Sequence, residues 1–164
     1  MRKISPLLIA AVFCPSLVSF ADTVATCSGD SAGRSYYMYG GIIPEGESGF
    51  GEDSTPSMKV SLTLSDEGNW DILWVDARNE IYSARDSGGN VSFIGIGATG
   101  FSIGVVYNTD VGLVTGIYAL SLRPDNKWEL SISQQKQLNS FTNTGFEVVA
   151  CQYVDLDNII EKIR

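Results

Sequence analysis

Apolar and polar residues alternate regularly between Met58 and Val75. The segment 58–65 reads M-K-V-S-L-T-L-S and the segment 70–75 reads W-D-I-L-W-V. Side chains of a strand point to opposite faces in turn, so each segment has one apolar face and one polar face. The residues D-E-G-N between the segments form turns readily, and Gly68 accepts a positive φ. This stretch therefore predicts an antiparallel hairpin with one buried face.

Similar segments, separated by turn-forming residues, follow along most of the chain. Further strands are expected at 34–39, 80–84, 91–96, 101–107, 113–122, 127–133 and 146–153. Residues 155–160 have the pattern of a short C-terminal helix that begins at Asp155 or Asp157. The pattern therefore predicts an all-β fold, an antiparallel meander of about eight strands after the aromatic strand 34–39.

Three segments do not have a strand pattern. Residues 22–33 are small and polar, 40–56 are acidic and rich in glycine, and 134–145 are polar. They are expected to be connections, and the Gly40–Pro56 loop is long enough to be either a mobile segment or a contact surface.

The remaining connections are short, so neighbouring strands are expected to pair in chain order. An up-and-down sheet of this kind leaves two exposed edges unless it closes. Closure into a lipocalin-like β-barrel removes those edges, and this is the expected architecture. A two-sheet sandwich is the alternative.

Residues 1–21 are typical of a secretory signal peptide. Arg2 and Lys3 form a short basic start, an apolar run follows, and small residues stand at positions 19 and 21. The apolar run is shorter than the ~20 residues that a membrane-spanning helix needs, so no membrane anchor is expected. The short basic start suits a bacterial signal, and the predicted location is periplasmic or secreted, with 22–164 as a single domain.

The chain is acidic, with a net charge of −8 that becomes −10 when Arg2 and Lys3 leave with the signal peptide. This charge disfavours nucleic acid and anionic lipid as partners, because both are bound through Lys and Arg. It favours a basic protein if the chain has a protein partner, although solubility alone also explains it.

After removal of residues 1–21, the two remaining cysteines are Cys27 and Cys151. A pair of cysteines in an exported chain usually forms a disulfide. This bridge would tie the start of the domain to its last strand, where a barrel has to close.

The sequence contains no histidine. A Ser-His-Asp triad, a Cys-His pair and a His-ligated zinc site are therefore excluded. The glycines at 95, 97 and 100 match G-x-G-x-x-G, but a strand rather than a helix is expected after them, so they do not indicate a nucleotide site. Carboxylates and amides occur in turns without the spacing of a catalytic pair or a calcium loop. No cofactor, no metal and no enzymatic activity is predicted.

Two groups of residues are candidates for binding. The first is the aromatic trio Tyr36, Tyr37 and Tyr39, which either fills the core or lines a ligand cavity. The second is the turn 82–89, Y-S-A-R-D-S-G-G, with Ser83, Arg85 and Asp86 as its polar members. Exported inhibitors often present such a turn to an enzyme cleft, and this turn resembles by analogy the Ser- and Gly-containing loop of the periplasmic lysozyme inhibitors.

Four stretches are similar to a group of small exported bacterial β-proteins of unknown function. They are C-S-G-D-S-A-G-R-S-Y-Y from Cys27, D-I-L-W-V-D-A from Asp71, S-A-R-D-S-G-G from Ser83, and the late Cys151. The resemblance implies an exported single domain and adds no catalytic residue.

These observations predict an exported binding module that uses its turns and the Gly40–Pro56 loop to contact or inhibit a protein, for example a basic hydrolase. A carrier that holds a small apolar ligand inside the barrel is the alternative. A hydrolase that uses carboxylates is a third hypothesis, which requires two carboxyl groups that converge in a pocket.

Overall fold

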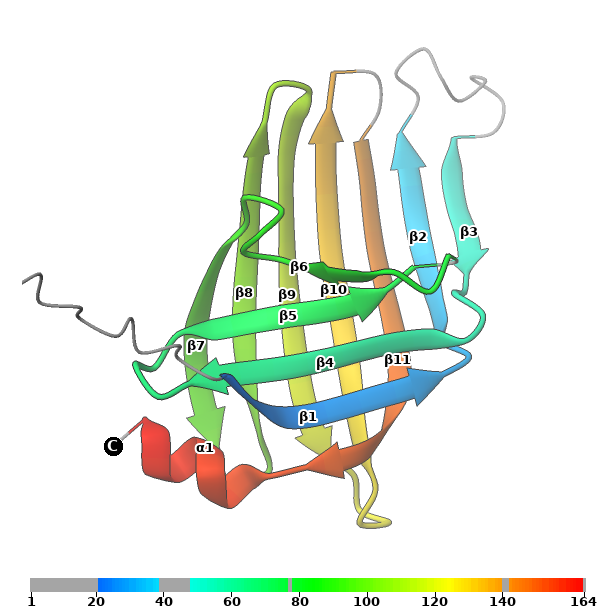
Figure 1. The fold of residues 1–164 in the computed structure, drawn as a ribbon. Coiled ribbons are helices and arrows are strands. Elements are labelled where there is room, and N and C mark those ends of the chain that lie inside the picture. Colours follow the sequence, from blue (N-terminus) through cyan, green and yellow to red (C-terminus); the bar gives the residue numbers. More distant parts are fainter. Residues whose placement is uncertain (1–20, 39–47, 77, 140–141, 164) are drawn as a thin grey trace, which may run out of the picture.

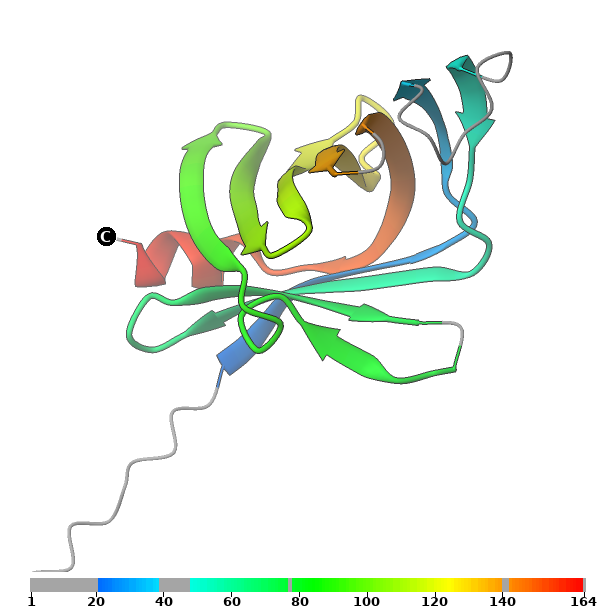
Figure 2. The same ribbon diagram turned by 90° about the horizontal axis from the view of Figure 1, so that it is seen from above.

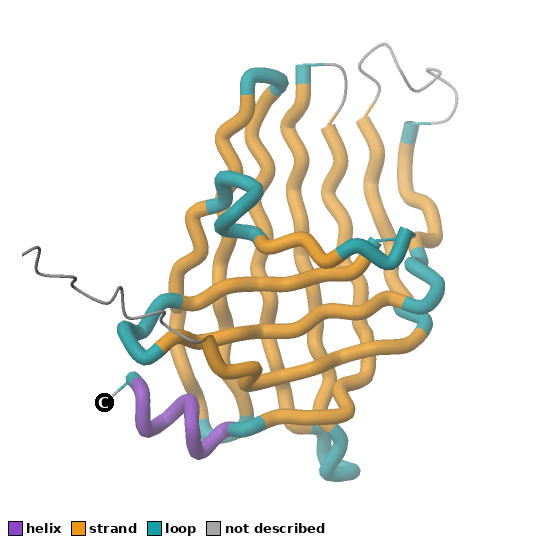
Figure 3. Tube along the Cα trace, viewed as in Figure 1, coloured by secondary structure: helices purple, strands orange, loops and turns teal. Residues whose placement is uncertain are grey.

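The computed structural model describes residues 21–38, 48–76, 78–139 and 142–163. Within these residues the chain forms eleven strands and one helix (Figure 1, Figure 3). The elements are β1 (Ala21–Gly29), β2 (Ala32–Met38), β3 (Gly49–Asp53), β4 (Met58–Ser65), β5 (Trp70–Val75), β6 (Ile81–Ser83), β7 (Asn90–Gly97), β8 (Gly100–Thr109), β9 (Gly112–Leu122), β10 (Trp128–Leu138), β11 (Thr142–Val154) and α1 (Leu156–Lys162). The predicted signal peptide lies almost wholly outside the described residues.

The strands form two antiparallel layers that share β11. The first sheet has the order β6-β5-β4-β1-β11, and the second has the order β3-β2-β11-β10-β9-β8-β7. The first sheet lies across one face of the second, and its strands run crosswise to those behind it (Figure 1). Figure 2 shows the two layers from above, with the second sheet curved over the first. This crosswise arrangement of two layers fits a β-sandwich in which the strands of the two layers cross.

The long strand β11 connects the layers because it changes partner along its length. Residues 142–148 pair with β2, whereas residues 151–154 pair with β1. The disulfide between Cys27 and Cys151 joins β1 to β11 at directly opposite positions, which confirms the predicted bridge. It therefore fixes the point at which one strand passes from one sheet to the other.

The core lies between the two sheets and is made of alternate residues of each. From the first sheet come Val60, Leu62, Leu64 and Ile72, and from the second come Ile103, Leu120, Leu130 and Val149. Trp70 of the first sheet stacks on Phe93 and packs against Phe101 of the second, with ring centroids 5.8 and 5.2 Å apart. The alternation in the sequence thus places one face of each sheet in a common interior.

The predicted barrel is not what the structure has. The paired strands end at β6, β7 and β3, and within the described residues no pairing joins these ends. The predicted chain-order meander is also wrong in part, because β1 pairs with β4 and β11, and β2 pairs with β11 and β3. Only β4–β5–β6 and β7 to β11 follow the expected order. The alternative, a two-sheet sandwich, fits the observed layers.

Three segments predicted to be irregular contain strands. The lead-in 22–33 includes β1, which lies between β4 and β11 with Val24, Ala25 and Cys27 buried. The 40–56 segment includes β3, and its residues 40–47 lie outside the described part of the chain. The 134–145 segment is mostly strand as well, since β10 continues to Leu138 and β11 begins at Thr142.

The short C-terminal helix is confirmed. Asp155 is its N-cap and accepts a hydrogen bond from the backbone N–H of Asn158. Ile159 is fully buried against the core, which attaches the helix to the end of the sandwich. None of the helical residues that the structure describes belongs to a helix long and apolar enough to cross a membrane.

Candidate functional site

The two sheets separate at one end and leave an inner cleft of about 750 Å³ between them. Strands β8 to β11 extend beyond the first sheet at this end (Figure 1). The cleft is bounded by β4, β5 and the residues before β4 on one side, and by the inner face of β8 to β11 on the other. It is therefore a continuation of the core in which the opposing layer is missing.

The walls near the core are apolar and aromatic. From the first sheet, Met58, Val60 and Trp74 line the cleft, and from the second, Tyr107, Val114, Tyr118 and Ile132. The rings of Trp74 and Tyr107 meet edge to face across the gap, with centroids 6.4 Å apart. Val60, Tyr118 and Ile132 are each less than a tenth exposed, so the deep end of the cleft is a core-like surface.

Two glycines flank Gln134 on the inner face of the second sheet. Gln134 of β10 pairs with Gly116 of β9 and with Gly145 of β11, so the three residues share a row across the inner face. A Cβ at Gly116 would lie 3.2 Å from the ring of Tyr118, and one at Gly145 would lie 2.7 Å from the hydroxyl of Ser35. Neighbouring side chains therefore occupy the space beside both glycines, and Gln134 stands between them as the long side chain at the centre of the row.

Polar groups surround the outer part of the cleft. Gln134 donates a hydrogen bond of 3.1 Å to the Tyr118 hydroxyl, and Glu147 accepts one from Ser31. Burial raises the pKa of the Tyr118 hydroxyl above its ordinary value of 10.0. Lys136 is half-buried beside Val114 and, among the described residues, makes no hydrogen bond or ion pair. The cleft therefore combines an apolar end with a rim of both charge signs.

The hydroxyl of Tyr107 has no hydrogen-bond partner within the described residues, although the atom itself is buried. Burial is the main cause that raises the pKa of this phenol, and Tyr118 and Asp71 raise it further. Its ring lies against Gly89, where a Cβ would come within 2.7 Å of the ring atom Cε1. The turn 84–89 therefore covers one side of the cleft wall.

The candidate turn 82–89 is held in place by its own polar residues. Ser83 donates a hydrogen bond to Asp71 of β5 and accepts one from the backbone of Asp86. The Arg85 guanidinium donates to the carbonyls of Trp70 and Val91, and so connects β5 with β7. Ser83 and Arg85 thus organise the turn, whereas Asp86 is exposed at its tip.

The aromatic candidates Tyr36 and Tyr37 lie on opposite faces of β2. Tyr36 points to the outer face of the second sheet, where its ring lies 4.7 Å from that of Phe50. Tyr37 is on the inner face, in the same row as Asn143 and Lys136. Tyr39 lies outside the described residues. Tyr36 and Tyr37 are therefore not brought together, and none of the predicted binding residues that the structure describes lines the inner cleft.

The carboxylates that line the cleft have structural partners. Asp76 accepts hydrogen bonds from the backbone N–H groups of Arg78 and Glu80 and so closes its own turn. Glu147 is bonded to Ser31 as described above. In the described part of the chain, no three acidic or cysteine side chains cluster as a metal site would require.

The sequence pattern did not single out Val114, Gln134 and Lys136 as lining residues. For Gln134 and Lys136, the signal that would have found them is the alternation that continues past the predicted end of the strand at Ser133. In the segment Trp128–Leu138, every second residue from Trp128 points inward, but beyond Ile132 these residues become polar. A strand whose inward face turns from apolar to polar indicates an open end of a core.

We compared the chain with protein-family models, with curated proteins and with solved structures, and none of them matches it.

Proposed function

We propose that this protein is an exported binding protein that holds a small amphipathic molecule in the inner cleft. The observation that carries the proposal is the size and lining of the cleft, about 750 Å³ with aromatic and aliphatic walls and a polar rim. Small-molecule sites have volumes of roughly 300–1,000 Å³ and similar linings. The disulfide between Cys27 and Cys151 supports export to an oxidising compartment such as the periplasm.

The distribution of polar groups supports an amphipathic ligand over a purely apolar one. An apolar body would displace water from Trp74, Tyr107 and Val114. A polar head would then lie at the rim, where Gln134 and Lys136 offer hydrogen-bond donors. Because the rim also carries Asp76 and Glu147, an uncharged or zwitterionic head fits it better than a strongly charged one.

The test is a titration of the chain from Asp22 with the uncharged fluorophore N-phenyl-1-naphthylamine, whose emission rises in apolar sites. Val114→Trp would fill the cleft, and we expect it to reduce the affinity at least about tenfold. Leu113→Trp is the matched control, since Leu113 is the adjacent residue and points to the outer face. Saturable binding that survives in Val114→Trp would contradict the proposal.

The turn 82–89 supports a second candidate function, contact with a protein partner. Its tip is exposed, and its conformation is fixed by Asp71, Ser83 and Arg85 before any partner arrives. Such preorganisation lowers the cost of binding. The acidic chain favours a basic partner, so inhibition of basic secreted hydrolases such as lysozyme is the assay. Inhibition that Asp86→Lys abolishes would support this function, and a lack of inhibition would count against it.

A further inference from the structure

The second sheet carries another hollow on its outer face, on the side opposite to the inner cleft. This outer groove has a volume of about 680 Å³ and crosses the sheet from β3 to β9. Neighbouring residues of one strand face the two sites in turn. On β9, for example, Val114 lines the inner cleft and Thr115 lines the outer groove. Apart from Gln134, which lines both sites, the inner cleft and the outer groove are lined by different residues.

Three aromatic rings stand along the groove. Tyr36 and Phe50 form a tilted pair at one end, and Phe146 lies on the adjacent strand β11. Phe50 is 77% exposed and Phe146 is 48% exposed. Exposed apolar side chains that gather in one patch are typical of contact surfaces, and these three rings gather along one groove.

Uncharged polar side chains line much of the rest of the groove. Ser133, Gln135, Thr144 and Thr115 come from three adjacent strands and line the groove. Within the part of the chain that the structure describes, none of these four side chains has a hydrogen-bond partner. Ser131, on the same face but outside the groove, instead donates to the carbonyl of Ala119. The groove thus presents a set of unused donors and acceptors.

Charge is scarce in the groove although the protein is strongly acidic. Arg34 is the one charged residue that lines it. Glu52 of β3 lies opposite Arg34, yet the described residues contain no ion pair between the two. An anionic polymer would have a single cation to bind, and a basic protein would have no carboxylate in the groove. The surface therefore suits an uncharged ligand.

We propose that the outer groove binds an uncharged oligosaccharide. The negative face of an aromatic ring attracts the C–H groups of a sugar ring, and Tyr36, Phe50 and Phe146 offer such faces. Sugar hydroxyls both donate and accept hydrogen bonds, as do the hydroxyls of Ser133 and Thr144 and the amide of Gln135. This combination of rings and neutral polar groups distinguishes a sugar from an apolar peptide, which would leave the polar groups without partners. The proposal does not depend on the function proposed for the inner cleft.

The test is calorimetric titration of the chain from Asp22 with a panel of neutral oligosaccharides, namely cellohexaose, xylohexaose, mannohexaose, maltohexaose and hexa-N-acetylchitohexaose. We expect at least one to bind and Phe146→Ala to weaken that binding roughly tenfold. Gln135→Ala should also weaken it, because the variant removes hydrogen bonds without changing an aromatic ring. Val106→Ala is the matched control, since Val106 is 45% exposed on the same face but does not line the groove.

The variants Val114→Trp and Phe146→Ala separate this proposal from the one for the inner cleft. Val114→Trp blocks the inner cleft and should leave oligosaccharide binding unchanged, whereas Phe146→Ala should leave binding of N-phenyl-1-naphthylamine unchanged. Far-ultraviolet circular dichroism shows that each variant is folded. Failure of all five oligosaccharides to bind the folded protein would overturn the proposal. Light scattering that shows a dimer lost in Phe146→Ala, without sugar binding, would assign the surface to self-association instead.

Discussion

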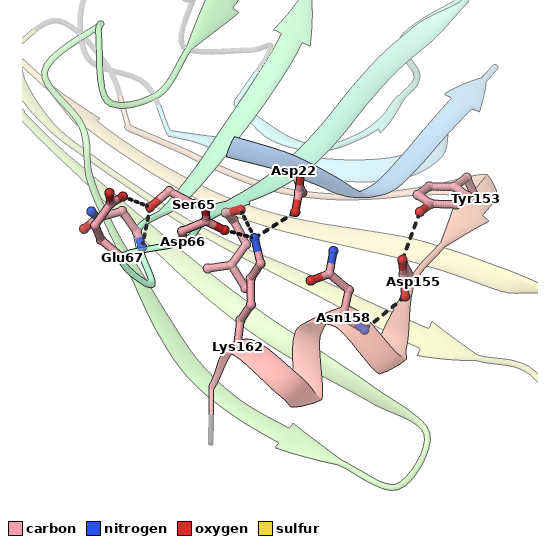
Figure 4. A network of polar contacts seen from close by, with 10 residues as sticks. Asp22, Ser65, Asp66, Glu67, Tyr153, Asp155, Asn158 and Lys162 are labelled. Atoms are coloured by element: carbon pink, nitrogen blue, oxygen red, sulfur yellow. Dashed lines mark hydrogen bonds and ion pairs between the residues drawn. The ribbon is translucent and has the colours of Figure 1, made fainter. Parts of the chain in front are cut away.

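The ammonium group of Lys162 lies 2.8 Å from the carboxylate of Asp22, which joins the last helix to the first strand (Figure 4). Lys162 also contacts Asp66, at 2.9 Å, in the turn between β4 and β5. Asp22 is the first residue of the predicted mature chain. The hydrogen bond from Lys162 lowers the pKa of the Asp22 carboxyl below its ordinary value of 3.8. The same bonds to Asp22 and Asp66 raise the pKa of Lys162 above 10.5.

We predict that Lys162→Met lowers the melting temperature and that the loss depends on pH. A lowered carboxyl pKa adds stability above 3.8, which is lost as the pH falls through the pKa in the folded state. A raised lysine pKa adds stability below 10.5, which is lost as the pH rises through the folded-state pKa. The difference between Lys162→Met and the parent should thus stay constant between about pH 5 and 9 and shrink outside these limits.

The control for this prediction is Lys127→Met. Lys127 has a carboxylate neighbour at 3.5 Å, but it is in a solvent-exposed turn, so its removal should change the melting temperature little. Thermal unfolding across the pH range, followed by circular dichroism, measures both variants. An unchanged melting temperature in Lys162→Met at pH 7 would show that the helix does not depend on this contact.

Removal of the disulfide should destabilise the fold strongly. Cys27 and Cys151 are 124 residues apart in sequence, and a crosslink over so long a loop contributes about 4–5 kcal/mol in the chain-entropy model. We expect the double variant Cys27→Ala, Cys151→Ala to lose free energy of unfolding of this order in urea titrations. The parent protein with dithiothreitol is the control, and equal stability of parent and variant under oxidising conditions would contradict the prediction.

Arg85 is predicted to stabilise the contact between β7, at the edge of the second sheet, and β5 of the first sheet. Its guanidinium bonds the carbonyls of Trp70 and Val91, which belong to different sheets. Because hydrogen bonds from a charged donor contribute about 1.5–3 kcal/mol, Arg85→Met should lower stability by ~2 kcal/mol. In Arg85→Met, the backbone amides of β7 should exchange hydrogen faster than they do in the parent, and the increase should be larger in β7 than in β10. The exposed Arg78 is the control position, and an equal effect of Arg78→Met would argue against a specific role of Arg85.

Loss of the hydroxyl group should affect the free energy of unfolding differently at the two tyrosines of the cleft. The Tyr107 hydroxyl is buried and has no partner among the residues that the structure describes, so Tyr107→Phe should keep or raise the free energy of unfolding. The Tyr118 hydroxyl accepts a bond from Gln134, so Tyr118→Phe should lower it by about 0.5–1.5 kcal/mol. Urea titration of both variants is the measurement. A loss of stability in Tyr107→Phe as large as that in Tyr118→Phe would contradict the assignment.

The parts of the fold that the sequence predicts correctly are those with strict alternation. The hairpin 58–75 appears as β4 and β5 with the predicted bounds and the predicted buried face. Strand β1 was missed because its residues are small and polar, and it is a strand through pairing with β4 and β11 on both sides. Strand β3 reads G-F-G-E-D, a composition typical of loops, and it is held by pairing with β2.

The inner cleft could not be predicted because it depends on where one sheet ends over the other. The sequence shows which residues of β10 share a face, but the opposing layer changes along that face from Leu62 and Ile72 to open space. The position at which the first sheet ends is decided by pairing between strands far apart in sequence, such as β1 with β11. The predicted residue Tyr36 does lie in a groove, yet its neighbours Phe50 and Phe146 come from a segment expected to be loop and from the last strand.

The most direct test of ligand binding in the inner cleft is methyl NMR of the chain from Asp22 during addition of N-phenyl-1-naphthylamine. Val60, Val114 and Ile132 have methyl groups in the cleft, whereas Val106 and Ile117 have theirs on the outer face. We predict saturable shifts of the first three signals and little change in the other two. Shifts confined to Val106 and Ile117, or no saturable shift at all, would contradict the proposal that the space between the sheets is a binding site.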